Sequence, residues 1–538
     1  MSEKKAPLFV RDATGLVRAF GWFDAFWIVS FGFGSSVITS LAFFIAYYPI
    51  TAPNGRAEIA ILIAFPLSLI VYWPNLQMSI AMPRSGGDYV YVSRVIHPLI
   101  GFMNSFAFTT AAIIGIGISV PYVVSLGLTA PLYVVGIQTG NAFLSGLANV
   151  LAQPWVDFGF GTLIMVVIFL VMTLGSDALK IFNRFQLLIF LAASALLFYS
   201  FATYSHSDFI AGINALAPQT GVTVDKIISA AQGAGWQPPQ YTLLGALPAL
   251  PIAMFTYYAA SFSSYFAGEV KDIKRTQPIA TLFFMVSSLI YWFIMMILVV
   301  NMFGDQLWTA FTWVVFGPGA GTPLFPVLMP PQVLMFLFSA PAQLLFNLLL
   351  VVNWVQWFVF FWMAAMRSMF AWAFDRVFPQ KFAAISDRFK SPIWCGVTVF
   401  IFAEIFQYLF IFTTLFTGQF NFLLILSSAL IIPNIAAAVF PFRNKQMFDA
   451  NPRIVSARIA GIPIISILGV LGALIMGWIT YIMIGGTLSY ALGPANLAAF
   501  AFFFAIYGAG IVVFAIAYTI RKRQGVDLAK IFETIPPE

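Results

Sequence analysis

The feature that most constrains this chain is a succession of twelve apolar stretches, each long enough to cross a lipid bilayer as a helix. A membrane helix needs about 20 mostly apolar residues, because the hydrocarbon core is about 30 Å thick. Only 8% of the residues are charged, against about 25% in soluble domains. The sequence therefore predicts an all-α polytopic membrane protein with twelve transmembrane helices, over 20–48, 57–82, 98–130, 156–174, 184–204, 244–267, 278–303, 333–374, 392–416, 420–441, 458–485 and 495–520.

The lysines and arginines give these spans an orientation. Twenty-four of the 26 lie in the two termini and in every second loop, and only Arg56 and Lys226 lie in the remaining loops. Loops rich in lysine and arginine stay in the cytoplasm. We therefore expect a multi-pass protein of the cell membrane with both termini in the cytoplasm. The net charge of +7 reflects this distribution and does not indicate nucleic acid binding.

The reactive side chains are too few for most kinds of catalytic site. Cys395 is the only cysteine, so an intramolecular disulfide and a cysteine metal cluster are excluded, and His97 and His206 are the only histidines. A membrane enzyme would need acids, bases or metal ligands that converge within the bilayer, and the spans contain almost none. We expect no enzyme, no metal site and no cofactor.

The first span is interrupted near its middle. Its stretch Phe31–Ser36 contains two glycines and two serines. Glycine lowers helix propensity, and serine competes for backbone hydrogen bonds. Backbone groups freed within a bilayer must be covered by protein or line a cavity. The stretch therefore predicts a substrate site or, alternatively, a close helix contact made by small residues.

The sixth span carries a second interruption. Pro248 and Pro251 lie in its first half, and small and hydroxyl residues follow. Spans one and six are equivalent if the first ten spans form two five-helix repeats, and matched interruptions point to the central site of a transporter. The exposed ends of half-helices suit a zwitterion. The N–H groups of Gly34, Ser35 and Ser36 would take a carboxylate, and the carbonyls of Gly32, Phe255 and Tyr258 an ammonium.

Five segments of the chain resemble motifs of one family of membrane proteins. Met82–Tyr89 resembles the loop P-x-S-G-G-x-Y, and Glu269–Pro278 resembles E-V-K-N-P-x-R-x-I-P. The other three are Gly34–Ile38, Arg367–Pro379 with Lys390–Pro392, and Phe440–Arg443 with Gly461–Pro463. Because all five occur in order along nearly the whole chain, it is similar to the amino acid permeases of the amino acid–polyamine–organocation superfamily.

This resemblance implies a fold of two five-helix repeats in inverted orientation with two additional helices, in which helices one and six are broken. The expected organisation is a cytoplasmic segment 1–19, a first repeat 20–204, a second repeat 205–441 with an outer loop 205–243, helices eleven and twelve in 442–520 and a cytoplasmic tail 521–538. The implied activity is amino acid transport by alternating access.

The resemblance also implies roles for single residues. Phe255 resembles the family's aromatic gate, although membrane helices also bury many aromatic rings without a gating role. The chain departs from the family at Ser36, which replaces the second glycine of Gly-Ser-Gly, and at Ala259, which replaces a glycine of the sixth helix. Gly32, Gly34, Ser35, Ser36, Phe255, Tyr258 and Ala259 are thus the expected substrate-binding residues.

Three acidic residues are candidates for gating or for a proton relay. Asp24 begins the first span and Glu269 ends the sixth, where either would act in an inner gate or lie at the membrane interface as an ordinary helix-end charge. Glu404 lies within the ninth span, where a carboxylate must be paired or protonated. It is a candidate proton relay or, alternatively, a protonated acid bonded to a neighbour such as Gln407.

The sequence thus predicts a secondary active transporter for an amino acid, of the neutral class because the interrupted stretches lack charge. The coupling ion would be H⁺ or Na⁺, and exchange is a further option. The alternative is an amino acid receptor on the same scaffold that binds without transporting. The expected partners are the amino acid and the lipid bilayer.

Overall fold

Long apolar helices account for most of the chain. The structure is a computed structural model that describes residues 18–27, 47–215, 217–317, 337–416, 422–485 and 497–533. Within these ranges, 11 helical segments are long and apolar enough to span a membrane. They correspond to predicted spans two to twelve. The first predicted span starts with α1 (Trp22–Asp24), and residues 28–46, with Gly32, Gly34, Ser35 and Ser36, lie outside the described residues.

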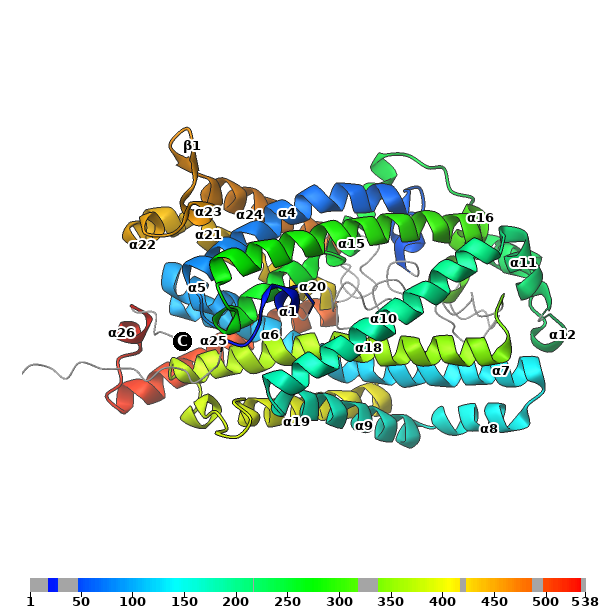
Figure 1. Cartoon of the computed structure of the whole chain (residues 1–538), viewed down its shortest axis with the longest axis horizontal. Helices are drawn as coiled ribbons and strands as arrows, with labels where there is room; N and C mark the ends of the chain where they lie inside the picture. Colours follow the sequence, from blue (N-terminus) through cyan, green and yellow to red (C-terminus); the bar gives the residue numbers. More distant parts are fainter. Residues whose placement is uncertain are drawn as a thin grey trace, which may run out of the picture.

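The spans run side by side along the long axis of the molecule (Figure 1). In the first half of the chain they are α4 (Ala57–Ala81), α6 (Pro98–Tyr122) continued by the π-helical η2 (Val123–Thr129) and by α7 (Ala130–Thr139), α9 (Pro154–Thr173) and α10 (Ser176–Thr203). The third span is therefore longer than the predicted 98–130, because the π-helical turn carries the helix on to Thr139.

The second half continues the same arrangement. Its spans are η3 (Leu244–Ala249) with α14 (Leu250–Phe255) and η4 (Tyr258–Glu269), α15 (Ile273–Phe303), α18 (Ala340–Phe374), α19 (Ile393–Phe412), α20 (Phe422–Ala429) with α21 (Ile431–Arg443), α24 (Ile464–Gly485) and α25 (Leu497–Arg523). The tenth span is divided near Leu430, and the sixth is divided at Phe255–Tyr258.

Polarity is distributed as expected for a protein in lipid. Large apolar side chains such as Leu188 and Leu474 are exposed on the outside of the bundle, whereas Asn75, Asn104 and Gln356 are buried inside it. Lipid offers no hydrogen bonds, so the polar groups of a membrane bundle turn inward and bind other helices. The interior between the spans is therefore where a polar site can form.

Short elements lie at the two ends of the bundle. At the end that carries the C-terminus are α5 (Asp88–Val95), α22 (Lys445–Asp449), α23 (Arg453–Ser456), the hairpin of β1 (Arg458–Ile459) and β2 (Ile462–Pro463), and α26 (Leu528–Phe532) (Figure 1). We call this the C-terminal end. Its elements belong to loops for which the lysine and arginine pattern predicts a cytoplasmic position. η6 (Gln380–Ala383) belongs to another such loop.

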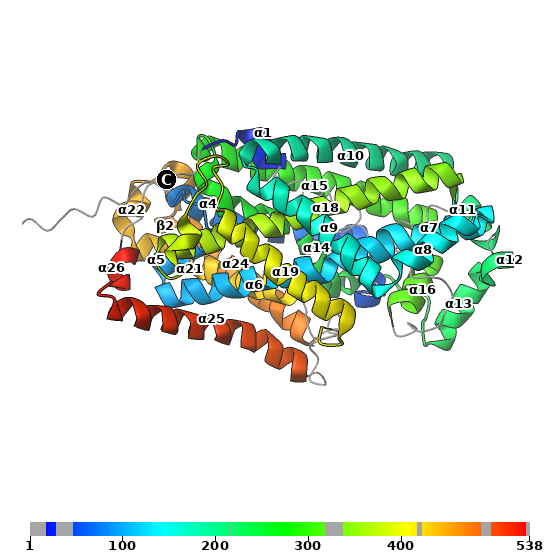
Figure 2. The same cartoon turned by 90° about the horizontal axis from the view of Figure 1, so that it is seen from below.

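The opposite end carries the longer loops. It holds α8 (Ala142–Leu151), α11 (His206–Ala215), α12 (Ala217–Thr220), α13 (Val224–Gly233) and α16 (Asp305–Phe316) (Figures 1 and 2). Trp313 of α16 donates a hydrogen bond from its indole Nε1 to the Ala234 carbonyl at 3.1 Å. The two long loops predicted between spans five and six and between spans seven and eight thus contain helices that bind each other.

Candidate functional site

The predicted interruption of span six is present in the structure. The α-helix α14 ends at Phe255, Thr256 and Tyr257 form a turn, and the chain continues from Tyr258 as the 3₁₀-helix η4. A 3₁₀-helix rarely exceeds four residues, and a longer one inside a span often marks a hinge. η4 has 12 residues. The change of helix type therefore places a structurally unusual backbone in the middle of the bundle.

Neighbouring helices support the backbone at this interruption. The Tyr257 N–H donates to the Met254 carbonyl at 3.0 Å. The same carbonyl accepts a hydrogen bond from the Tyr72 hydroxyl of α4 at 3.4 Å. The Thr256 carbonyl accepts one from the Ser288 hydroxyl of α15 at 3.3 Å. Such partners are what an irregular backbone needs in order to persist within a membrane.

Three predicted substrate residues lie at the interruption and are buried. Phe255 and Tyr258 stack with ring centroids 6.1 Å apart, and Ala259 is fully buried beside them. The Tyr258 hydroxyl donates to the Leu426 carbonyl of α20 at 3.4 Å. The structure therefore brings the interrupted part of span six against span ten, while the predicted partners in span one lie outside the described residues.

The start of span one pairs with the end of span six. The Phe20 N–H donates to the Glu269 carbonyl at 3.0 Å, and the Lys271 N–H donates to the Phe20 carbonyl at 2.9 Å. These two bonds form a parallel β-bridge between Phe20 and Val270. The first residues of span one are thus tied by their backbone to the last residues of span six.

A buried ion pair joins this junction to span eight. Arg367 of α18 donates from Nε to Oε1 of Glu269 at 2.7 Å and from Nη2 to Oε2 at 3.0 Å. Both residues are buried, with exposed fractions of 5% and 3%. Because the pair is bidentate and shielded from water, loss of either partner would leave a buried charge uncompensated, which loss of a surface ion pair does not do.

Asp24, the other predicted gating residue, is placed differently. Its Oδ2 accepts a hydrogen bond from the Gly21 N–H at 3.1 Å, which caps the start of α1. Among the described residues it forms no ion pair with an arginine or a lysine. Asp24 therefore stabilises the first turn of span one, and the bidentate ion pair at this end of the bundle is formed by Glu269 with Arg367.

Two glycines allow the loop Met82–Tyr89 to pack against spans six and eight. Gly86 has a φ of +129° and Gly87 a φ of +66°, both in the region that favours glycine. A Cβ atom on Gly86 would lie 2.5 Å from the Cβ of Ala371, and one on Gly87 would overlap the ring of Tyr265. The Gly86 N–H donates to the Tyr265 carbonyl at 3.1 Å. The loop is therefore fitted closely to η4 and α18.

A second buried ion cluster, which the sequence did not indicate, lies behind this loop. Asp375, at the end of α18, accepts from Arg84 at 3.1 Å and from Arg94 at 3.0 Å, and all three side chains are almost fully buried. Arg84 and Asp375 each belong to one of the motifs named above, so the residues themselves could be singled out from the sequence, but their pairing could not. Only the fold brings the two motifs together, since they lie 291 positions apart.

Glu404 forms its hydrogen bond with Thr162 and not with Gln407, the partner suggested by the sequence. Its Oε2 accepts from the Thr162 hydroxyl of α9 at 2.9 Å, whereas Gln407 donates to the Phe158 carbonyl at 3.0 Å. Both bonds join α19 to α9. Glu404 therefore lies between spans four and nine and away from the interruption of span six.

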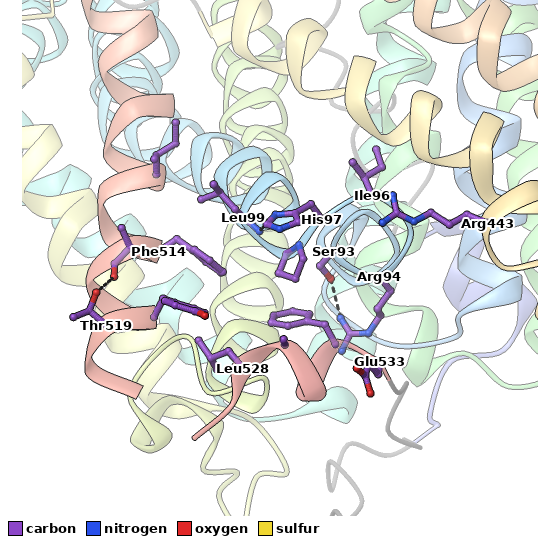
Figure 3. A pocket seen from close by; sticks show the side chains of 16 residues that line it. Ser93, Arg94, Ile96, His97, Leu99, Arg443, Phe514, Thr519, Leu528 and Glu533 are labelled. Carbon is purple, nitrogen blue, oxygen red and sulfur yellow. Dashed lines mark hydrogen bonds between the residues drawn. The ribbon is translucent and has the colours of Figure 1, made fainter. Parts of the chain in front are cut away.

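A groove at the C-terminal end separates α5 from α25 and α26. Figure 3 shows Arg94, His97 and Arg443 on one side of it and Phe514 and Leu528 on the other. Its volume is about 680 Å³. The α26 end is anchored by Phe532, whose ring lies 5.3 Å from the Arg94 guanidinium and makes an edge contact with Tyr89. The C-terminal segment thus contacts the same loop and helix that pack against span six.

The described residues contain no group of three or more histidine, cysteine, aspartate or glutamate side chains that could hold a metal ion. The arrangement offers polar backbone at the interruption and ion pairs beside it. This combination is suited to binding a small polar molecule.

The chain matches the family described as amino acid permease over residues 20–506, which is nearly its whole length. No curated protein matches it closely enough to count as a relative. The family match includes the interruption of span six, the loop Met82–Tyr89 and both buried ion clusters described above. The chain therefore belongs to the amino acid permease family, within the amino acid–polyamine–organocation superfamily, whose members are membrane transporters and not enzymes.

Proposed function

We propose that the protein is a secondary active transporter that moves a neutral amino acid across the cell membrane by alternating access. The substrate lies beside the interruption of span six, where the sequence predicts a matching interruption of span one. The observation that carries this proposal is the buried change from α14 to η4 at Phe255–Tyr258, because irregular backbone within a bilayer persists only where it serves a site or is covered by protein.

The direction of the half-helix determines what it can bind. The helical run from Leu244 ends at Phe255, so its carbonyl end faces the interruption. Carbonyl ends carry partial negative charge and attract cations. In this proposal the substrate ammonium binds at the carbonyls of Phe255 and Tyr258, and its carboxylate binds at Gly34, Ser35 and Ser36 of span one.

The side-chain class follows from the same segment. Leu244–Gly268 contains no charged residue. A cationic or anionic side chain would need a buried countercharge at the site, because burying an unpaired charge is costly. The aromatic pair of Phe255 and Tyr258 instead offers an apolar surface, which suits a neutral amino acid, and the ring of Phe255 acts as the gate that covers it.

The inner gate of this transporter is the junction of Phe20, Glu269 and Arg367. In the described conformation the backbone bridge and the bidentate ion pair hold span one, span six and span eight together. To open the site toward the C-terminal end, these contacts must separate. A strong, buried pair of this kind favours the closed state until substrate binding shifts the equilibrium.

The test is uptake of radiolabelled amino acids by proteoliposomes that contain the purified protein. Uptake is measured with an imposed H⁺ gradient, with an imposed Na⁺ gradient, and with unlabelled amino acid inside. Gradient-driven accumulation is the expected result and identifies the coupling ion, whereas flux that requires internal amino acid identifies an exchanger. Saturable binding without flux in all three conditions would overturn the proposal and favour a receptor.

A pair of variants tests where the substrate binds. F255A removes the ring at the interruption, and F143A removes a ring from α8 that is 73% exposed. We expect F255A to raise the substrate concentration for half-maximal uptake roughly tenfold, which corresponds to about 1.4 kcal/mol. F143A should match the wild type. Equal kinetics for the two variants would place the site elsewhere.

A further inference from the structure

A small cavity lies directly beside the interruption of span six. Tyr258 and Tyr265 of η4 line it, together with Asn75 of α4 and with Asp88 and Tyr91 of α5. Its volume is about 10 Å³, which leaves room for about one water molecule. An amino acid side chain is too large for this space, so whatever binds here is as small as a proton, a water molecule or a single ion.

Asp88 is the acidic group in this cavity and is 7% exposed. Its Oδ2 accepts a hydrogen bond from Nδ2 of Asn104 at 2.6 Å, and its Oδ1 accepts one from the Tyr265 hydroxyl at 3.0 Å. Asn104 also donates to the Ala429 carbonyl of span ten at 2.9 Å. The carboxyl group thus links α5 with spans three, six and ten, but only through neutral donors.

No arginine or lysine of the described residues forms an ion pair with Asp88. The nearby arginines of the same loop and helix, Arg84 and Arg94, bind Asp375. Within the described part of the chain, the titratable groups that face Asp88 are tyrosines, which lie on α5, η4 and α25: Tyr91, Tyr258, Tyr265 and Tyr507. Burial accordingly raises the pKa of Asp88 to about 6, against the opposing effect of its hydrogen bonds.

We propose that Asp88 is a proton-binding site whose occupancy is linked to the movement of span six. The ligand is a proton and not a metal cation, because the donors of Asn104 and Tyr265 point at the carboxylate oxygens. A hard cation would instead need several oxygen lone pairs directed at it. When the carboxyl is protonated, Asn104 continues to donate to it, and the Tyr265 hydroxyl turns from donor to acceptor.

The link to span six follows from the position of Tyr265. Its ring packs on Gly87, directly before Asp88, and its hydroxyl binds Asp88. If η4 moves away as the inner gate opens, Asp88 loses the hydroxyl and gains water, which stabilises the carboxylate and releases the proton to solvent. When η4 returns, the site is dehydrated and takes up a proton. This inference rests on the proposed transport function only for its link to substrate movement.

The first experiment measures proton binding without transport. Infrared spectra of the purified protein are recorded across pH 4 to 9 for the wild type, D88N and D177N. The expected result is a carboxylic acid C=O band that titrates near pH 6 in the wild type and in D177N and is missing in D88N. Asp177 is a suitable control, because its side chain is 91% exposed and lies outside the cavity. An unchanged band in D88N would overturn the assignment.

A second variant keeps the test decisive if D88N does not fold. Y265F removes only the hydroxyl that stabilises the charged carboxylate. Its C=O band should therefore titrate at a higher pH than the band of the wild type, because loss of a donor to the carboxylate raises the pKa of Asp88. A midpoint that stays unchanged, or that moves to lower pH, would contradict the proposal.

The second experiment measures the link to transport. Uptake driven by an H⁺ gradient is compared with exchange against internal amino acid in the wild type, D88N and E404Q. We expect D88N to retain the exchange rate of the wild type, whereas its gradient-driven uptake should be at least tenfold lower than that of the wild type. Loss of that uptake in E404Q with full retention in D88N would assign the relay to Glu404. If the wild type shows no flux, the transport proposal fails while the infrared result still decides the proton site.

Discussion

Arg367 holds Glu269 with two parallel hydrogen bonds, from Nε to Oε1 at 2.7 Å and from Nη2 to Oε2 at 3.0 Å. The arginine begins the fourth of the five motifs that resemble the permeases, and the glutamate lies at the end of the interrupted sixth span. Since the Glu269 carbonyl also accepts a hydrogen bond from Phe20, one residue joins spans one, six and eight. This relationship makes the junction the most direct target for mutation.

Removal of one charge from this pair should be strongly destabilising. E269Q leaves the guanidinium of Arg367 buried without a countercharge, which typically costs 3 to 5 kcal/mol. We expect a lower unfolding temperature for the purified protein and a lower yield of folded protein.

The double variant E269Q/R367M tests the physical reason. It removes both charges, so much of the lost stability should return, because replacement of a whole buried pair is often nearly neutral. The comparison requires four proteins, the wild type, both single variants and the double variant, in one series of thermal unfolding measurements. Additive losses in the double variant would show that the two side chains do not interact.

In the cluster of Asp375 with Arg84 and Arg94, loss of the carboxylate should destabilise the protein more than loss of one arginine. D375N leaves Arg84 and Arg94 without their shared carboxylate, whereas R84M leaves Asp375 still paired with Arg94. D375N should therefore lower the unfolding temperature more than R84M does. D177N breaks only an exposed pair with Lys180 and should change stability by less than about 1 kcal/mol. An R84M variant that is less stable than D375N would contradict this reading.

Much of this architecture could be predicted from the sequence because lipid imposes simple rules. The long apolar stretches indicated spans two to twelve, and the paired prolines Pro248 and Pro251 indicated the interruption at Phe255–Tyr258. The end of the third span was less predictable, since a π-helical turn at Val123–Thr129 continues a helix that periodicity alone does not extend.

The contacts between distant motifs could not be predicted in the same way. Glu269 and Arg367 were each recognisable within a motif, but nothing in either segment identifies the other as its partner. In the sequence, Asp88 is one position in the loop Met82–Tyr89, with no sign of a role of its own. Its burial, its bonds to Asn104 and Tyr265 and its lack of a cation within the described residues depend on how four elements meet in space.

Substitution of Gly87 should disrupt the packing of the loop Met82–Tyr89 against spans six and eight. G87A forces a side chain into a position with φ of +66° and into overlap with the ring of Tyr265. We expect a lower unfolding temperature and at least a tenfold loss of uptake. The matched control is G146A in α8, where a Cβ atom would meet nothing within 4 Å. There alanine should be neutral or stabilising by up to about 1 kcal/mol. Equal effects of the two substitutions would mean that the close fit of the loop is unimportant.

The C-terminal segment should contribute to the stability of α5. F532A removes the ring that lies 5.3 Å from the Arg94 guanidinium and contacts Tyr89. Loss of a buried phenylalanine typically costs 3 to 5 kcal/mol, but at this terminal helix we expect local release of α26 before global unfolding. Hydrogen exchange should therefore increase in Leu528–Phe532 and in α5, with little change in α13 at the opposite end. Exchange confined to α26 would show that α5 is stable without it.

Titration of Asp88 should make the stability of the folded protein depend on pH. An unfolded aspartate has a pKa of about 3.9, whereas burial raises the pKa of Asp88 in the folded protein to about 6. Between these values the folded state binds more protons than the unfolded state, so the contribution of Asp88 to stability falls as pH rises and stays constant above the upper value. The total change is on the order of 3 kcal/mol.

D88N removes the titrating group. The unfolding temperature of the wild type relative to D88N should therefore decrease from pH 4 to pH 7 and then level off, while D177N follows the wild type throughout. Parallel curves for the wild type and D88N would mean that Asp88 keeps the same proton affinity in both states, and the buried carboxyl would then have no driving force to take up a proton when span six closes over it.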